Sequence, residues 1–577
     1  MGRLKYMTTE KLKKVNWKLV TILLVAFILR VWNLNVNPPS LSSDEAALGY
    51  NAYSILKTGK DEYGKLLPII FKSFGDYKPG LCVYLTVPFV FLFGLNEWSV
   101  RLPSALAGVV GVYLLYSIVK KFIDYDFLQV ETKVSSRSLA LISSLIFALA
   151  PWHVYFSRGG WEANISLTLT LAGIYFFIKA LKNNKFLIFS SVFFALTFIA
   201  YQGAKLATTI VLFTLAVLFW KNCIGFFKDC RKTLFFAFVL ASLIASPSIL
   251  SFSQGQTGRL TVFSVFSYPR PVDYIEKMLF QNNEKIGDLN YLLFHNEPLN
   301  YTRAILGRYF NHFSARFLFF DGDYQNPKHS SPNQGMLMFY DLLLLPFGFY
   351  YLGRSKGAFK KFILLLLLLT PLPAVLTRDQ VQAVRALNMV VPLTLVSSLG
   401  GLSLIIFFRR LFKNSKAMAS IAIVAFLFIL TTSLVYFLDS YFIHQPIHNA
   451  KYWNWGYKQI IKTLLPIQDN YKIVYFQQGY DQPYIYYLFY SRYDPKAYQK
   501  QAKLSYYLGP DVGLVETLDN IDFAGWSWPF ATGEKSTLTI GNGVAIPSDF
   551  SRKDYNLISE IKYPDNFMTA FRIVETK

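Results

Sequence analysis

The chain has 577 residues, of which 53% are hydrophobic and 16% charged, and its formal net charge is +23. Soluble globular domains carry about 25% charged residues, so this composition, with a mean hydropathy of +0.31, excludes an ordinary soluble enzyme. The basic residues are spread among short loops between apolar runs, which excludes a nucleic-acid partner. The 3 cysteines form no disulfide framework.

The N-terminal stretch "KLKKVNWKLVTILLVAFIL" is basic and then apolar, as in a signal sequence. No small-residue cleavage site follows it, so we expect a retained first membrane helix. Further apolar runs are long enough to cross a bilayer as helices, which takes about 17–25 residues. The candidate spans are 19–34, 100–119, 139–156, 165–178, 186–200, 206–220, 234–250, 336–351, 362–376, 386–408 and 418–438.

The distribution of charge gives the expected orientation. Loops 120–137, 179–185, 221–232, 354–361 and 409–416 each hold three or four Lys and Arg, whereas turns 157–161, 201–205 and 377–385 hold one or two. Basic residues stay on the cytoplasmic side of membrane helices, so the N-terminus is expected in the cytoplasm. One further apolar run, 81–95, can then not cross, and we expect it to be re-entrant or to lie at the membrane interface.

The predicted fold class is an α-helical polytopic membrane protein with about 11–13 transmembrane helices. Residues 1–438 form its membrane domain, with a large first outer loop at 35–98 and a second at 251–334. Residues 439–577 form a soluble extracytoplasmic domain. There, "YKIVYF" is typical of a strand and "QPYIYYLFYSRY" of a helix, so a small α/β domain is predicted.

Four stretches in this order resemble one family: "SSDEAALGYNAYSILKTG", "FGDYKPGLCVYL", "GLNEWSVRLPSALAGVVGVYLLY" and "PWHVYFSRGGWEANISL". They are similar to GT-C-type membrane glycosyltransferases that use polyprenyl-phosphate-linked sugars. This group includes protein O-mannosyltransferases and lipid A aminoarabinose transferases. The resemblance implies an inverting transfer of a sugar from the lipid carrier to an acceptor hydroxyl on the extracytoplasmic face. No nucleotide-binding glycine motif is present, as a lipid-phosphate donor requires none.

The resemblance also implies the catalytic residues. Direct displacement at the anomeric carbon needs a carboxylate that takes the proton of the acceptor hydroxyl. Asp44 occupies the family's position for this general base, and Glu45 matches a second acidic position with a supporting or metal-binding role. Glu162 matches an acidic residue of the second outer loop that lines the active site. An ion pair between Arg158 and Glu162 at helical spacing is the competing interpretation.

Cations are needed where negative charge grows on the departing phosphate. By resemblance, Lys78 and Arg101 bind the carrier phosphate, although Lys78-Pro79-Gly80 departs from the family's Lys-Pro-Pro at its last position. An interfacial arginine that reaches the headgroups is the alternative for Arg101. The further phosphate-binding candidates are Arg158 and Arg385. The sequence indicates no certain cofactor. His329 and Glu45 are a candidate pair of ligands for a divalent metal ion. The alternative is that His329 is an ordinary surface histidine.

Two other classes of function remain open. An oligosaccharide transferase or polymerase would share the acidic outer loop, and a transporter or flippase of lipid-linked sugars would share the many helices. Transporters place ionisable residues inside helices, often in inverted repeats, whereas here the carboxylates lie in outer loops. The expected partners are the polyprenyl-phosphate sugar, an acceptor glycan, lipid or protein, and membrane lipids. The expected location is the plasma membrane, with the active site and C-terminal domain outside.

Overall fold

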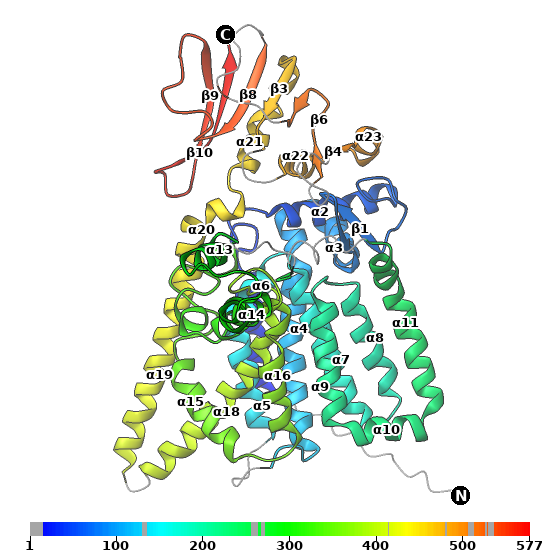
Figure 1. Ribbon diagram of the computed structural model, residues 1–577, viewed down its shortest axis with the longest axis vertical. Helices are drawn as coiled ribbons and strands as arrows, with labels where there is room; N and C mark the ends of the chain where they lie inside the picture. The colour runs from blue at the N-terminus through cyan, green and yellow to red at the C-terminus, as the bar shows by residue number, and fades with distance from the viewer. Residues whose placement is uncertain are drawn as a thin grey trace, which may run out of the picture.

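The computed structural model describes residues 16–577 except 130–135, 256–263, 267–271, 413–414, 479–481, 506–512, 525–527 and 529–535. It has a bundle of helices with a small unit of strands and helices packed on one end (Figure 1). We call this end of the bundle the capped end. The other end carries the turn that joins α7 (Glu162–Ala180) to α8 (Phe186–Phe198).

The N-terminal half of the bundle follows the predicted apolar runs. α4, the longest of its helices, begins where the Asn96 side chain accepts a hydrogen bond from the Ser99 amide. α5 and α6 meet at an angle of 56° because Pro151 starts a new helix. The helices are α1 (Trp17–Val31), α4 (Glu97–Asp124), α5 (Ser136–Leu149), α6 (Pro151–Arg158), α7 (Glu162–Ala180), α8 (Phe186–Phe198), α9 (Ala204–Leu218), α10 (Trp220–Asp229) and α11 (Arg231–Ser253).

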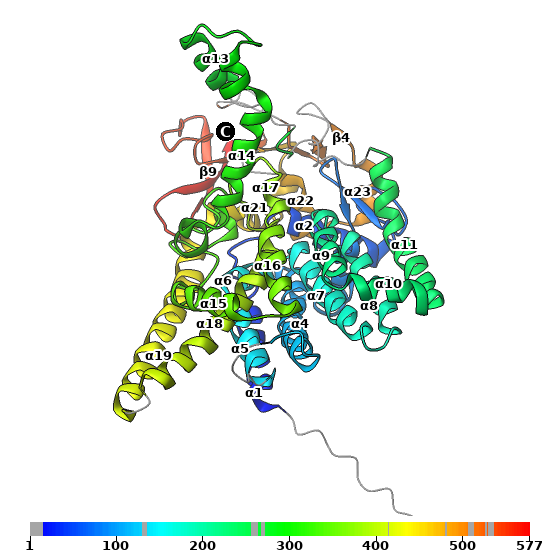
Figure 2. The same ribbon diagram turned by 60° about the horizontal axis from the view of Figure 1, so that its bottom comes forward.

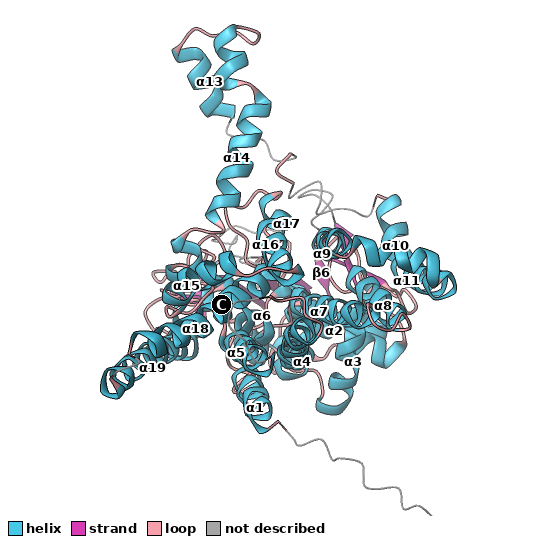
Figure 3. Cartoon of the chain, turned by 90° about the horizontal axis from the view of Figure 1, so that it is seen from below, coloured by secondary structure: helices cyan, strands magenta, loops and turns pink. Residues whose placement is uncertain are grey.

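The C-terminal half of the bundle starts with two helices, α13 and α14, that extend away from the others as an arm (Figure 2, Figure 3). The remaining helices return to the bundle, where α15 packs closely along α18. The elements are α13 (Val272–Gln281), η1 (Tyr291–His295), α14 (Glu297–Asn311), η2 (Arg316–Phe320), η3 (Pro327–His329), α15 (Asp341–Arg354), α16 (Ala358–Leu369), α17 (Leu372–Val375), η4 (Leu387–Met389), α18 (Val390–Leu411), α19 (Lys416–Asp439), η5 (Ser440–His444) and α20 (Gln445–His448).

The first loop at the capped end is built on α2 (Ser43–Thr58). A capping box starts this helix, since the Ser42 hydroxyl accepts from the Glu45 amide and the Glu45 carboxylate accepts from the Ser42 amide. Gly59, at φ 70°, ends the helix in the left-handed conformation that glycine tolerates best. The two acidic residues of the motif therefore lie in the first turn of a helix.

A short hairpin and a short helix follow α2. β1 (Ile70–Ser73) and β2 (Asp76–Pro79) pair antiparallel, with Lys78 opposite Phe71. The short helix is α3 (Leu81–Phe93). At its first residue, the Leu81 amide donates to the Ile199 carbonyl, just after α8. Just past its last residue, a Cβ added at Gly94 would lie 4.0 Å from the Arg492 side chain of the C-terminal unit. Both ends of α3 thus lie at the capped end, which agrees with the expectation that run 81–95 does not cross.

The C-terminal unit is a small α/β assembly, as predicted. "YKIVYF" forms β3 and "QPYIYYLFYSRY" forms α22. Its sheet has the order β6-β7-β3-β8-β10-β9, in which β3 is parallel to both β7 and β8. The elements are η6 (Ala450–Trp453), α21 (Tyr457–Leu464), η7 (Gln468–Asn470), β3 (Ile473–Phe476), α22 (Pro483–Ser491), α23 (Pro495–Gln501), β4 (Leu504–Ser505), β5 (Leu514–Val515), β6 (Thr517–Leu518), β7 (Ile521–Asp522), β8 (Thr537–Asn542), β9 (Tyr555–Lys562) and β10 (Thr569–Thr576).

Two large hydrophobic cores hold the molecule together. One lies inside the bundle. The other is shared, because buried residues of α2, α3 and the hairpin pack with those of α21, α22 and the sheet. For example, Tyr50 of α2 packs edge to face on Tyr498 of α23. The C-terminal unit is therefore continuous in its packing with the first loop.

Among the described residues, six helices are long and apolar enough to cross a membrane, or up to eight if each of two bent pairs counts as one span. α11 and α19 expose most of their apolar surface, which suits contact with lipid tails. The chain is a multi-pass α-helical membrane protein, as predicted. Several expected spans are shorter helices, such as α8 with 13 residues and α15 with 14.

Candidate active site

A cavity of about 310 Å³ opens at the capped end, beside the start of α2. Six stretches of chain meet around it, at 42–51, 71–83, 160–163, 201–202, 326–329 and 378–385. It contains most of the residues that the resemblance singled out, although they lie far apart in the sequence. The predicted residues that line it are Asp44, Glu45, Lys78, Glu162, His329 and Arg385.

Asp44 and Lys78 form an ion pair at the edge of this cavity. Asp44 lies in the first turn of α2, and its Oδ1 accepts a hydrogen bond from the Lys78 ammonium on β2. The Asp44 side chain is 51% exposed and that of Lys78 16% exposed, so the carboxylate faces the open space while the ammonium lies deeper. The predicted base and the predicted phosphate ligand therefore contact each other directly.

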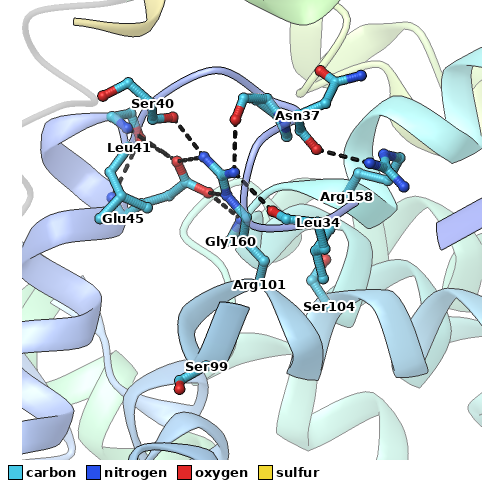
Figure 4. A network of polar contacts seen from close by, with 12 residues as sticks. Leu34, Asn37, Ser40, Leu41, Glu45, Ser99, Arg101, Ser104, Arg158 and Gly160 are labelled. Carbon is cyan, nitrogen blue, oxygen red and sulfur yellow. Dashed lines mark hydrogen bonds and ion pairs between the residues drawn. The ribbon is translucent and has the colours of Figure 1, made fainter. Parts of the chain in front are cut away.

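Arg101 lies outside the cavity, which corrects its expected role in phosphate binding. The guanidinium is fully buried, and all five of its N–H groups have acceptors (Figure 4). Nε donates to Glu45 Oε1 at 2.9 Å, and one Nη2 contact is Glu45 Oε2 at 3.3 Å. The other donors bind the carbonyl oxygens of Leu34, Pro38 and Ser40. Arg101 thus fixes the chain before α2 and neutralises Glu45.

Arg158 is likewise buried behind the cavity wall and does not line it. Its Nη1 donates to the Leu29 carbonyl oxygen at 2.8 Å. Its Nη2 donates to the Asn37 carbonyl oxygen, also at 2.8 Å (Figure 4). The guanidinium also lies over the Phe442 ring, 4.8 Å from its centroid. Like Arg101, it holds the segment between α1 and α2. The sequence alone did not show that these two arginines bind backbone carbonyls.

Glu45 organises the wall from within. Besides its bonds to Arg101 and the Ser42 amide, its Oε1 accepts from the Gly160 amide at 2.8 Å. A Cβ at Gly160 would lie 3.1 Å from Glu45 Cγ, so the close approach of the two chains favours glycine here. This contact places Glu162, the first residue of α7, at the cavity beside Trp161.

His329 reaches the cavity from the loop before α15. Its Nδ1 lies 2.9 Å from Asp323 Oδ2, and because a carboxylate only accepts, the proton is on Nδ1. Burial lowers the pKa of His329, and the hydrogen bond to Asp323 opposes this shift. Asp323 Oδ2 also accepts from the Ala383 amide, which ties this loop to residues 378–385. The sequence analysis did not predict Asp323. Its position six residues before His329 is the feature from which a pairing of the two side chains could have been inferred.

The candidate metal site does not fit the residues present. Both oxygens of Glu45 are used by Arg101 and backbone amides, and the ion pair already balances its charge. The described parts of the chain contain no group of three or more His, Cys, Asp or Glu side chains able to hold an ion. Glu45 therefore has no carboxylate oxygen left to join His329 in holding a metal ion.

The cationic side of the cavity comes from loops at its rim. Arg385 lies with Nη1 3.9 Å from Asp379 Oδ2, and Arg378 lines the cavity next to them. The Arg378 carbonyl accepts from Arg308 of α14, which anchors the arm to this loop. Lys328 joins these cations and was not predicted. Lys328 and Asp379 were not predicted as site residues because single charged residues are common in loops.

One family model and one curated relative match parts of the chain. Residues 78–250 match the family model of dolichyl-phosphate-mannose-protein mannosyltransferases. A putative mannosyltransferase, YycA of Bacillus subtilis (strain 168), is 30% identical over 135 residues, which are 23% of this chain. The matched part is 18% of that relative's length.

The solved structures that match this chain do so at low sequence identity and with TM-scores below 0.5. ArnT from Cupriavidus metallidurans, bound to undecaprenyl phosphate, gives a TM-score of 0.49 at 11% identity and covers 96% of this chain and 97% of its own. The oligosaccharyltransferase of Archaeoglobus fulgidus gives 0.47 at 12% identity, over 83% of this chain and 63% of its own. The resemblance seen in the motifs is thus confirmed for the segment from Lys78 to Leu250, which is similar to the dolichyl-phosphate-mannose-protein mannosyltransferase family.

Proposed function

We propose that this protein is a membrane glycosyltransferase that moves a sugar from a polyprenyl-phosphate carrier to an acceptor hydroxyl, with Asp44 as the general base. The observation that carries the proposal is a cavity lined both by an exposed carboxylate, Asp44, and by cations from three other segments, of which Lys78 pairs with Asp44 directly. The similarity of residues 78–250 to mannosyltransferases supports the same class of reaction.

The chemical step needs one base and one stabilised leaving group. Asp44 takes the proton of the acceptor hydroxyl as its oxygen attacks the anomeric carbon. The bond between that carbon and the phosphate oxygen breaks, and the carrier phosphate leaves with the bonding electrons. Attack opposite the leaving group inverts the anomeric configuration. Glu162, at the same cavity, accepts hydrogen bonds from sugar hydroxyls and so orients the ring.

Lys78, Arg378 and Arg385 balance the charge of the departing phosphate. Charge-assisted hydrogen bonds to phosphate are about twice as strong as neutral ones. When the carrier phosphate arrives, it competes with Asp44 for the Lys78 ammonium. Binding of the donor thus frees the carboxylate to accept a proton. Arg101 and Arg158 act only by holding the segment before α2.

The orientation belongs to the proposal as well. The basic loops lie at the end opposite the cavity, so the cavity faces outward if those loops are cytoplasmic. The protein then works at the outer face of the plasma membrane, where the acceptor is a glycan, a lipid or a protein.

Asp44→Asn tests the base. The amide keeps the size of the side chain but cannot take a proton, so transfer of labelled sugar from a purified polyprenyl-phosphate donor should fall by about 10²- to 10⁴-fold. Binding of the donor, measured separately, should remain. Asp124→Asn, at the far end of α4, is the matched control and should transfer normally. Near-normal transfer by folded Asp44→Asn would rule out this mechanism.

Lys78→Gln tests the phosphate ligand. Loss of one charge-assisted contact should weaken donor use by about tenfold to a hundredfold, mainly through a higher KM. Lys72→Gln changes the neighbouring strand of the same hairpin, outside the cavity, and serves as the control. Equal KM values in the two variants would remove Lys78 from the phosphate site.

A further inference from the structure

The tip of the hairpin that carries Lys78 has an unusual backbone. Phe74 and Gly75 join β1 to β2, and both have positive φ angles, 54° and 86°. Two-residue hairpin turns of this kind favour Asn or Gly at the first position. A bulky aromatic residue there is an outlier, and such outliers persist only where the surrounding structure holds them. The position of the Phe74 side chain therefore calls for an explanation.

The C-terminal unit holds this turn in place. The Phe74 carbonyl accepts a hydrogen bond of 2.7 Å from the Gly513 amide, just before β5. The Phe74 ring is 8% exposed and packs edge to face on Tyr484 of α22, with centroids 6.0 Å apart. Phe74 thus has one backbone hydrogen bond and one aromatic contact with residues that lie more than 400 positions later in the sequence.

The Phe74 ring also contacts Lys78. The Lys78 Nζ lies 5.2 Å from the ring centroid, within the range of a cation–π contact. The same ammonium donates to Asp44 Oδ1. Lys78 is therefore held between an aromatic ring and a carboxylate, and the ring restricts where its flexible stem can place the charge.

We propose that Phe74 is a positioning residue, which the C-terminal unit holds so that its ring orients the Lys78 ammonium toward Asp44. Its contribution to sugar transfer rests on the proposed function. The orientation of Lys78 itself does not, so the two ideas can be tested apart. A role limited to packing would leave Lys78 unaffected by a substitution that keeps the side chain at position 74 apolar.

The first experiment measures Lys78 without any substrate. Phe74→Leu keeps the side chain apolar, although smaller, and removes the ring, whereas Phe74→Tyr keeps the ring. Lys78 should be acylated by an amine reagent about three- to tenfold faster in Phe74→Leu than in wild type, and at nearly the wild-type rate in Phe74→Tyr. Mass spectrometry of the peptides gives each rate. Lys72, whose Nζ lies over Tyr63, is the internal control and should not change.

A second variant tests whether the loss of an aromatic ring beside a different lysine also changes the acylation rate of Lys78. In Tyr53→Leu the ring beneath Lys57 on α2 is lost, 5.7 Å from its Nζ and outside the cavity. This variant should leave the acylation of Lys78 at the wild-type rate. An unchanged Lys78 rate in folded Phe74→Leu, or an equal rise in Phe74→Tyr, would overturn the proposal.

The third experiment links Phe74 to transfer through a double-mutant cycle. If Phe74 acts through Lys78, Phe74→Leu should lower kcat/KM about three- to tenfold in the wild-type background and have no further effect in Lys78→Gln. An equal loss in both backgrounds would show that Phe74 only packs. If wild-type protein transfers no sugar, the proposed function fails, while the acylation rates still decide the orientation of Lys78.

Discussion

At the scale of single residues, the buried pair of Arg101 and Glu45 supports the active site from behind. Breaking such a pair by removing one partner leaves an uncompensated buried charge and costs about 3–5 kcal/mol. Substitution of Arg101 would thus release three backbone carbonyls and Glu45 together. Loss of activity in such a variant would report on the shape of the cavity and would not identify a phosphate ligand.

Glu62 gives a prediction for the pH dependence of stability. It is fully buried, and burial raises the pKa of its carboxyl to about 8, although the hydrogen bond from Asn51 opposes this. The folded protein then keeps a proton that the unfolded chain loses near pH 4.5. Stability from this group is present at lower pH and declines as the pH rises toward 8.

Glu62→Gln should therefore gain stability relative to wild type as the pH rises from 5 to 8. One pKa unit corresponds to about 1.4 kcal/mol, so the relative gain should reach about 1–4 kcal/mol. Thermal unfolding of both proteins in detergent at a series of pH values measures it. Two curves that stay parallel across this window would show that Glu62 is already ionised in the folded state.

The sequence could place residues at the capped end of the bundle, but it could not decide which of them face the cavity. Asp44, Lys78 and Glu162 were expected at the site, and they line the cavity. Arg101, in the second turn of α4, and Arg158, the last residue of α6, were also expected there, but only tertiary packing decides whether such a side chain faces a cavity or a neighbouring carbonyl. Motif spacing carries no information about that choice.

At the scale of elements, α2 is packed between the bundle and the C-terminal unit. A Cβ at Gly49 would lie 2.5 Å from the Phe489 ring of α22 and 2.6 Å from Val100 of α4. α2 can therefore approach both neighbours only because this position has no side chain. The helix that carries Asp44 is fixed from two sides.

Gly49→Ala should destabilise the protein by about 1–3 kcal/mol, because overpacking forces the neighbouring elements apart. Gly307→Ala is the matched control: it is also in a helix, α14, and a Cβ there would have nothing within 4 Å. It should be neutral or slightly stabilising. The midpoint of thermal unfolding is measured for both variants. Equal midpoints would mean that α22 and α4 move apart to accept the added methyl group at no cost in stability.

The elements themselves were well predicted where apolar runs were long, since these can only be membrane helices. The bend at Pro151 and the shortness of α8 and α15 were not, because helix ends depend on local packing. The predicted boundary at 439 marks a change of composition. The packing does not follow it, because β1, α2 and α3 share a core with the C-terminal unit.

At the scale of the whole molecule, the shared core makes the C-terminal unit part of the scaffold of the candidate active site. Lys458 of α21 bonds Glu97 at the start of α4, and Tyr486 of α22 donates to the Leu41 carbonyl just before α2. These contacts connect the unit to the elements that carry the cavity. Residues 439–577 therefore position the first loop, whatever else they bind.

The last prediction concerns how the molecule lies in the membrane. Lys65, in the first loop, is exposed at the capped end, and Asn183, between α7 and α8, is exposed at the other. Basic loops favour the cytoplasm, so with the native cysteines replaced by alanine, Lys65→Cys should react with an impermeant thiol reagent on intact cells. Asn183→Cys should react only after the membrane is permeabilised. The opposite pattern would place Asp44 inside the cell, where a sugar carried on the outer leaflet could not reach it. Labelling of both sites on intact cells would contradict the prediction that the helix bundle separates them across the membrane.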